Sequence, residues 1–200
     1  WQGLTVTGGS LDNSAGGTLS SKDGELAISL GGALDNHGQG ALVSKGAQRI
    51  DAASLDNAQG IVSGESDVTL SIAGKLDNGQ GGLVSAQRAL SFERDDTLLN
   101  NAGGRINGGS LLLKGASLDN SDGQLISQGV LDVSSADLDN RGGALSGKQS
   151  LRLSAANLDN RGGLLTSDGE LELTAGRVDS ADGGEISARG DLRLTVERLV

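Results

Sequence analysis

The sequence predicts an all-β protein that coils into a right-handed parallel β-helix (a β-solenoid), with rungs of about 20 residues and three short strands in each rung. Two patterns predict this fold: a Leu-Asp-Asn triplet that recurs at a nearly constant interval, and an alternating apolar pair ahead of each triplet. A third observation, one Trp, one Phe and no Tyr or Met, indicates a narrow interior filled by small aliphatic side chains. Residues 1–200 are therefore expected to form a single repeat segment of about nine rungs.

The Leu-Asp-Asn triplet marks one corner of the repeat. Exact copies begin at Leu11, Leu34, Leu55, Leu76, Leu118, Leu138 and Leu158. Two relaxed copies, Leu99-Asn100-Asn101 and Val178-Asp179-Ser180, complete a series whose members begin 19 to 23 residues apart. A regular period of this length is typical of a repeat array in which every copy is one structural unit.

The first strand of each rung is predicted by two apolar residues separated by one residue that is usually polar. The pairs are Leu4/Val6, Leu26/Ile28, Val68/Leu70, Leu90/Phe92, Leu111/Leu113, Leu131/Val133, Leu151/Leu153, Leu171/Leu173 and Leu192/Leu194. This alternation is typical of a strand with one face in water. In the remaining copy Gln48 precedes Ile50 in the apolar position, and because a buried amide needs a hydrogen-bond partner we expect local distortion there.

Glycines after each triplet predict a turn, and a second apolar position predicts a further strand. These positions are Leu19, Leu42, Val62, Val84, Ile106, Leu125, Leu145, Leu165 and Ile186. Three short strands and three turns fit into about 20 residues, whereas a helical repeat needs a longer periodic segment. Strands of successive rungs would pair in parallel about 4.8 Å apart, so that equivalent residues lie in ladders around a roughly triangular section.

The third triplet residue is predicted to form a structural Asn ladder, in which each amide hydrogen-bonds to the amides above and below it. The ladder comprises Asn13, Asn36, Asn57, Asn78, Asn101, Asn120, Asn140 and Asn160. Asn also tolerates the left-handed backbone region, which suits it to a corner. The glycines that follow supply positive φ at no steric cost.

The composition argues against several classes of partner and cofactor. A net charge of −10 and the lack of stacking aromatics argue against a nucleic-acid partner. No apolar run approaches the ~20 residues of a membrane helix, so no membrane insertion is expected. The absence of Cys is compatible with export. No cofactor is expected, and without a signal-like N-terminus the segment is expected to be an internal piece of any secreted parent.

The Asp row beside the Asn ladder is a candidate metal site. It contains Asp12, Asp35, Asp56, Asp77, Asp119, Asp139, Asp159 and Asp179. Stacked carboxylates could bind Ca²⁺, or each Asp could accept backbone N–H bonds in its own turn. We favour the second interpretation, because the nonapeptide repeat of Ca²⁺-binding β-rolls is missing. No metal site is expected at His37, which has no second His or Cys to help it.

The segment from Ser91 to Thr97 breaks the repeat rhythm with extra charged residues. Its residues Glu93, Arg94, Asp95 and Asp96 form a candidate contact loop for a receptor or glycan. The plainer interpretation is an insertion tolerated at a turn, with Phe92 in a Leu position. Catalysis is not expected anywhere in the chain, because carboxylates recur in every rung instead of converging once, and aromatic substrate platforms are lacking.

The recurring pattern Leu-Asp-Asn-x-x-Gly-Gly-x-Leu-x-Ser-x-Gly-x-Leu-x-Leu, which extends from Leu4 to Val200, resembles the haemagglutinin repeats of filamentous haemagglutinin and related contact-dependent growth inhibition exoproteins. This resemblance implies a β-helical shaft in a large bacterial exoprotein, secreted to the cell surface through an outer-membrane partner by two-partner secretion. Such a shaft would hold an adhesin, receptor-binding or toxin-delivery module away from the cell. Asn100 in place of Asp and the Val178-Asp179-Ser180 copy depart from the pattern, and leave the local register open.

The alternative function is an adhesive binding module that contacts a receptor or glycan through an outer face or through residues 93–97. The residues between the members of the apolar pairs vary widely in character, from Thr5 and Leu112 to Asp132 and Arg152. A ligand recognised along the whole repeat would need a uniform face, so this variability favours the shaft.

We predict that the 200-residue chain is monomeric when dilute and self-associates end to end as its concentration rises. The reason is that terminal rungs present open strand edges, which pair readily with other strands. Light scattering over a concentration series tests this, and a mass that stays monomeric at high concentration would contradict it.

Overall fold

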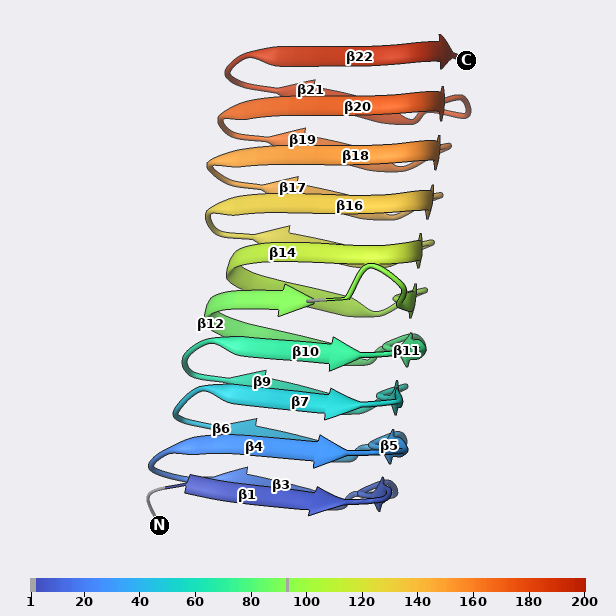
Figure 1. Cartoon of the computed structure of the whole chain (residues 1–200). Coiled ribbons are helices and arrows are strands. Elements are labelled where there is room, and N and C mark those ends of the chain that lie inside the picture. Colours follow the sequence, from blue (N-terminus) through green and yellow to red (C-terminus); the bar gives the residue numbers. More distant parts are fainter. Residues whose placement is uncertain (1–2, 93) are drawn as a thin grey trace.

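The computed structural model describes residues 3–92 and 94–200, and in these residues it contains strands and no helix. The chain climbs in successive turns from β1 at one end of the stack to β22 at the other (Figure 1). No helix in the described residues is long and apolar enough to cross a membrane.

Each rung begins with a strand that carries the apolar pair. These first strands are β1 (Gly3–Gly8), β4 (Glu25–Leu30), β7 (Gln48–Ala52), β10 (Val68–Ile72), β12 (Leu83–Phe92), β14 (Arg105–Asp119), β16 (Val130–Asp139), β18 (Ser150–Asp159), β20 (Glu170–Asp179) and β22 (Leu192–Leu199). The strands β12 and β14 also include the third strand of the rung before. The described chain thus forms about ten turns, one more than the nine triplets, because β22 starts a further turn.

The second strand ends at the middle residue of the triplet, and the third strand follows the glycine turn. Separate second strands are β2 (Leu11–Asp12), β5 (Ala33–Asp35), β8 (Ser54–Asp56), β11 (Lys75–Asp77) and β13 (Leu98–Asn100). Separate third strands are β3 (Thr18–Ser21), β6 (Ala41–Ser44), β9 (Ile61–Gly64), β15 (Gln124–Ser127), β17 (Ala144–Gly147), β19 (Leu164–Ser167) and β21 (Glu185–Ala188). From β14 onward, the first and second strands of a rung run together as one continuous strand.

Every strand pairs in parallel with its equivalent in the next rung. In the first strands Leu4 lies beside Leu26, and much later Leu151 lies beside Leu171. The triplets pair in the same way, as Leu11 does with Leu34. The prediction of a β-solenoid with turns of about 20 residues is confirmed.

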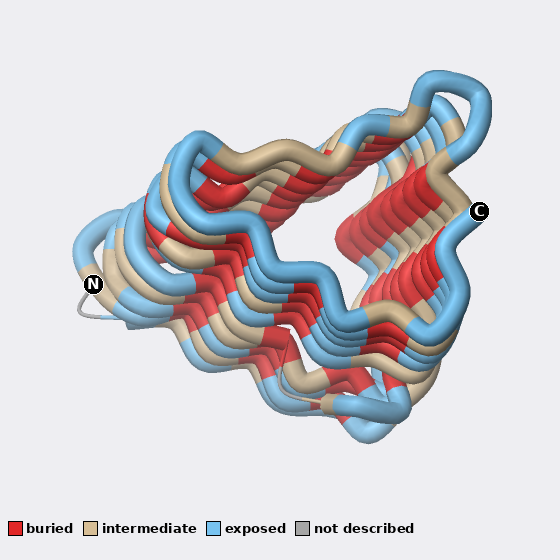
Figure 2. Tube along the Cα trace, turned by 90° about the horizontal axis from the view of Figure 1, so that it is seen from above, coloured by how far each residue is buried: buried red, intermediate tan, exposed pale blue. Residues whose placement is uncertain are grey.

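The aliphatic ladders fill the interior of the coil. Viewed along the axis, the turns superimpose in a roughly triangular outline, and buried residues form lines along its inner surface (Figure 2). Representative side chains from the three strands of the rungs, Leu26, Leu42 and Leu76, are each completely buried. Because like residues stack on like residues, the core is a set of continuous rows with few differences between rungs.

The expected distortion at Gln48 is absent, so that expectation is wrong. Gln48 pairs in register with Leu26 below and Val68 above, and its side chain is 1% exposed. The register holds because parallel pairing uses main-chain groups, while the unbranched side chain occupies the space of a Leu. Its Nε2 donates to the Leu42 oxygen at 3.4 Å, but its Oε1 has no partner, a cost of roughly 1–3 kcal/mol.

A register shift occurs instead in β12, between Ala86 and Ala89. Ala86 pairs with Gly108 and Ala89 with Ser110, so Gln87 and Arg88 lie opposite a single residue of β14. One extra residue in one strand is a β-bulge, which bends the strand locally and lets the ladder resume. Variation in rung length is thus absorbed without loss of the inner rows.

Candidate functional site

The Asn side chains form a continuous hydrogen-bonded ladder inside one corner. In each step from Asn13 to Asn160, Nδ2 of one residue donates to Oδ1 of the next at 2.7 Å. The final amide, Asn160, donates to Ser180 Oγ at 3.1 Å, where the relaxed triplet has no Asn. From Asn36 onward these side chains are fully buried, so the ladder satisfies polar groups whose burial would otherwise be costly.

Each amide also ties the corner to the main chain. Asn140 Nδ2 lies 3.3 Å from the Gly143 oxygen in its own rung and 3.5 Å from the Leu164 oxygen in the next. The main-chain N–H of Asn140 donates to the Asp159 oxygen at 2.7 Å. The side chain therefore joins the second strand, the glycine turn and the third strand of neighbouring rungs.

The last glycine of each corner turn is required because an Asn main-chain oxygen approaches it closely, from its own rung at Gly17 and from the preceding rung at the others. A Cβ added to Gly143 would overlap the Asn120 main-chain oxygen in the preceding rung, and would lie 2.7 Å from Asn140 Oδ1. A Cβ would overlap an Asn main-chain oxygen at every equivalent position: Gly17, Gly40, Gly60, Gly82, Gly104, Gly123, Gly143, Gly163 and Gly184. None of these nine glycines has positive φ.

The ladder Asn residues do not use the left-handed backbone region that Asn tolerates. Positive φ falls two residues later, at Asp122 (φ 53) after Asn120 and at Gly142 (φ 63) after Asn140. The Asn backbone stays extended because its N–H continues the parallel pairing with the next rung. The residues that follow the Asn form the tight turn.

The Asp next to each ladder Asn closes the turn on the outside of the corner. Its Oδ1 accepts the N–H two residues ahead, as in Asp119 to Ser121 at 2.9 Å and Asp139 to Arg141 at 3.0 Å. Asn100 makes the same bond with the N–H of Ala102 at 3.0 Å. These are Asx turns, and an amide oxygen closes them as well as a carboxylate does.

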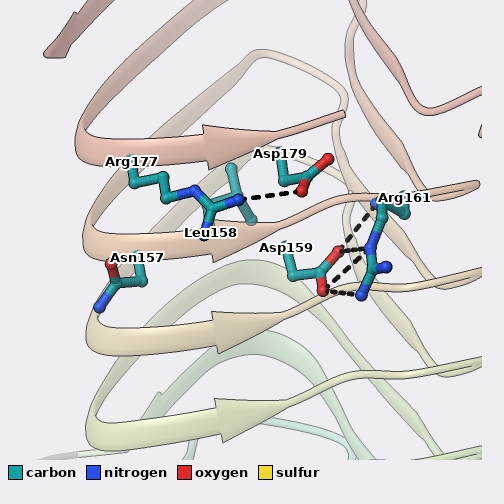
Figure 3. Close-up of a pocket in the computed structure, with 6 residues that line it drawn as sticks. All are labelled: Asn157, Leu158, Asp159, Arg161, Arg177 and Asp179. Carbon is teal, nitrogen blue, oxygen red and sulfur yellow. Dashed lines mark hydrogen bonds and ion pairs between the residues drawn. The ribbon is translucent and has the colours of Figure 1, made fainter. Parts of the chain in front are cut away.

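Arginines pair with the last three members of the Asp row, Asp139, Asp159 and Asp179. Arg161 Nη2 lies 2.6 Å from Asp159 Oδ2 and Arg177 Nη2 lies 3.2 Å from Asp179 Oδ2 (Figure 3). Together with Asn157 and Leu158 these residues line an open hollow of about 260 Å³. Its carboxylates are already engaged by guanidinium groups, which leaves little free charge for a ligand.

The rung before this hollow has the same arrangement. Arg141 Nη2 lies 2.5 Å from Asp139 Oδ2, and Arg141 Nε lies 3.8 Å from Asp159 Oδ2 in the next rung. The hydrogen bond from Arg141 holds the pKa of the Asp139 carboxyl below its usual range, and Arg161 lowers the pKa of Asp159 in the same way. Burial opposes both shifts but is the smaller effect.

The N-terminal half of the Asp row has other partners. Asp12 accepts from Ser14 Oγ at 2.6 Å, Asp77 pairs with Lys75 Nζ at 2.8 Å, and Asp35 Oδ1 lies 2.5 Å from His37 Nδ1. The hydrogen bond to Asp35 raises the pKa of His37. Asp56, one rung further on, lies close enough that ligand atoms of Asp35, His37 and Asp56 are all within 4.8 Å of one another.

That grouping was missed in the sequence, where His37 has no second His or Cys. Asp56 follows His37 by 19 residues, and proximity between them arises from the stacking of rungs. The Asp period of about 20 residues was the available signal, because it stacks Asp56 on Asp35, and Asp35 precedes His37 by two residues.

The candidate contact loop lies between β12 and β13. Arg94 and Asp96 come together as a bidentate ion pair, Nε to Oδ1 at 3.0 Å and Nη2 to Oδ2 at 2.9 Å, and Asp95 is exposed. Buried Thr97 anchors the loop by donating from Oγ1 to the Ile72 oxygen at 2.5 Å. Phe92 is buried and pairs with Leu70. Glu93 lies outside the described residues.

Comparison with known proteins gives one match. The family model of the haemagglutinin repeat matches four overlapping stretches, residues 1–38, 38–90, 68–135 and 130–196. No curated protein and no solved structure matches the chain.

Replacement of Asn140 by Leu is expected to lower the free energy of unfolding by roughly 2–5 kcal/mol, because Asn120 Nδ2 and Asn160 Oδ1 lose their partner inside the corner. Arg152→Leu, on the exposed face of β18, is the control and should change it by about 0.5 kcal/mol or less. Denaturant unfolding measures both, and equal losses would refute a stabilising role for the ladder.

Arg141→Gln is expected to destabilise the protein slightly at pH 7, because the arginine is half exposed and its ion pair is screened by water. Asp139 has a lowered pKa when folded, so its pairing stabilises the fold above the unfolded value of about 3.9. That stability is lost as the pH falls through the pKa of Asp139 in the folded protein. The melting temperatures of wild type and Arg141→Gln should then become equal.

Thermal melting between pH 7 and pH 2 measures this difference. Arg189→Gln serves as the control, because the Arg189 side chain is 82% exposed and its closest ion-pair distance is 3.4 Å, to Asp168. A difference between wild type and Arg141→Gln that persists unchanged at pH 2 would contradict the role of Asp139.

Proposed function

Because the chain belongs to the haemagglutinin-repeat family, we propose that it serves as part of the filament shaft of a secreted bacterial cell-surface exoprotein. In this role it holds a receptor-binding or effector module at a distance from the producing cell. The parent protein is an adhesin or a contact-dependent growth inhibition protein, and the segment itself performs no catalysis.

The observation that carries this proposal is the unbroken parallel pairing of rungs from β1 to β22. Each rung adds about 4.8 Å along the axis, so ten rungs contribute roughly 45 Å of length. Continuous inner rows and the Asn ladder run parallel to that axis, and bending the shaft would require many of these bonds to lengthen together. Length and stiffness are therefore the properties that this sequence supplies.

Secretion through an outer-membrane partner is supported by the local character of the contacts. Each rung pairs with the rungs directly before and after it, about 20 residues away in sequence. A chain that emerges in order can therefore add each rung onto the one already folded. Folding of this kind does not require the whole segment to be available at once.

An adhesive contact through an outer face is the second candidate function, and one surface feature favours it. A hollow of about 460 Å³ lies beside the β12 bulge, with Gly108 and Gly109 among its lining residues. Gln87, Arg105, Asn107 and Gln128 also line it, and they offer amide and guanidinium groups that suit a hydroxyl-rich glycan. The loop at residues 94–96 is a weaker candidate, since Arg94 and Asp96 already neutralise each other.

Deletion of residues 139–158 tests the shaft, since it removes one 20-residue turn and joins Leu138 to Asp159 in the triplet pattern. Small-angle X-ray scattering should show a rod that is shorter by about 4.8 Å, and circular dichroism should keep its strand spectrum. A globular particle or a collapsed spectrum would contradict the shaft.

Beads coated with the intact chain distinguish the two functions. The shaft predicts no binding to epithelial cells or erythrocytes. Binding that is lost in Arg105→Ala, and kept in the exposed control Arg189→Ala, would replace the shaft with the adhesive module.

A further inference from the structure

We propose that Asp35, His37 and Asp56 form a binding site for a divalent transition-metal ion of the Zn²⁺ type, which links two successive rungs at the outer corner. One ring nitrogen of His37 and one carboxylate oxygen from each Asp all lie within 4.8 Å of one another. Zn²⁺ bonds to His nitrogen and carboxylate oxygen are about 2.0–2.2 Å long, so two ligand atoms in tetrahedral coordination lie about 3.4 Å apart. The three side chains, two of them exposed, need to approach one another by up to about 1.4 Å to reach that spacing.

The donor set selects the class of ion. An imidazole nitrogen with two carboxylates suits Zn²⁺ and its neighbours, whereas Ca²⁺ and Mg²⁺ prefer oxygen ligands alone. Three protein ligands leave at least one coordination position to water. Because Asp35 is half-buried while His37 and Asp56 are exposed, this position faces solvent.

The corner places these three groups by features already present in the fold. Asp35 and Asp56 occupy paired positions of β5 and β8, one rung apart. Their Oδ1 atoms are held by the N–H groups of His37 and Ala58, at 3.1 Å and 3.0 Å. The same turn directs the His37 ring back onto Asp35, so the ion would take the place of the direct contact between these two side chains.

Most of the other carboxylates in the Asp row already pair with a cation, which leaves no such role for a metal. At Asp139, Asp159 and Asp179 a guanidinium already contacts the carboxylate, and at Asp77 the ammonium of Lys75 does so. Among the described residues, Asp56 has no ion pair with Lys or Arg, and Asp35 pairs with His37, which is a cation only when protonated. A bound ion would supply to these two rungs the positive charge that arginine supplies later.

The experiment is isothermal titration calorimetry of ZnCl₂ into the full 200-residue chain, free of any affinity tag, at pH 7.5 in a non-coordinating buffer. We expect one saturable Zn²⁺ site. His37 is the only histidine and there is no Cys, so the ring resonances of His37 report ligation directly by nuclear magnetic resonance. Melting temperature should rise with Zn²⁺, because an ion that binds the folded state stabilises it.

Two variants test the ligands. His37→Gln and Asp56→Asn should each weaken Zn²⁺ binding by roughly tenfold or more, since even changes outside the ligand shell cost 10–100-fold. Asp56→Asn keeps its Asx turn, because Asn100 forms that turn in this same chain. Its unchanged melting temperature without Zn²⁺ would show that the fold is retained.

Asp119→Asn is the matched control, because it removes a carboxylate from the same corner position where no histidine is near. It should bind Zn²⁺ as the wild type does. Equal weakening in Asp119→Asn and Asp56→Asn would mean diffuse attraction to the whole Asp row and would overturn the proposal. Absence of a saturable site, unchanged His37 resonances, or unchanged binding in either ligand variant would also overturn it.

Discussion

The close approach of successive rungs at the Asn corner is the constraint on which the rest of the fold depends. The main-chain oxygen of one ladder Asn lies where a Cβ on the glycine of the next rung would be, so this glycine position excludes every larger residue. The approach also brings the Asn amides to 2.7 Å from one another, a spacing that lets each amide donate to the next. Replacement of a ladder Asn by an apolar residue would leave the amides on either side of it without one of their partners.

Outside this corner, the rungs tolerate variation. Gln48 replaces an aliphatic residue without shifting its strand, and the β12 bulge absorbs an extra residue. Phe92 and Thr97, at the two ends of the insertion before β13, both remain buried. A fold whose rungs interact with their neighbours alone loses little when one rung carries an imperfection.

The outer side of the same corner connects architecture to function. Every rung repeats an Asx turn, so a shaft of this kind accumulates a row of carboxylates as it lengthens. The chain offsets that charge in different ways along its length, with hydroxyls, a histidine, a lysine and then three arginines. The inner ladder is uniform because it stabilises the coil, and the outer row is free to differ from rung to rung.

The sequence by itself determined the fold class, the rung length and the membership of the inner rows, because a strict period places equivalent residues in contact wherever the rungs stack. The Leu-Asp-Asn triplet identified the corner and its ladder residues for the same reason. The backbone conformation at that corner was not readable: Asn and Gly have more than one use in turns, and the structure assigns positive φ to the residues two places after the Asn. Only the tertiary structure decided that Gly143 serves close packing, that Gln48 keeps its register, and that His37 lies beside a carboxylate from the next rung. Each of these depends on distances between atoms of neighbouring rungs. A one-dimensional pattern indicates which residues are stacked, but it does not give the orientation of their side chains.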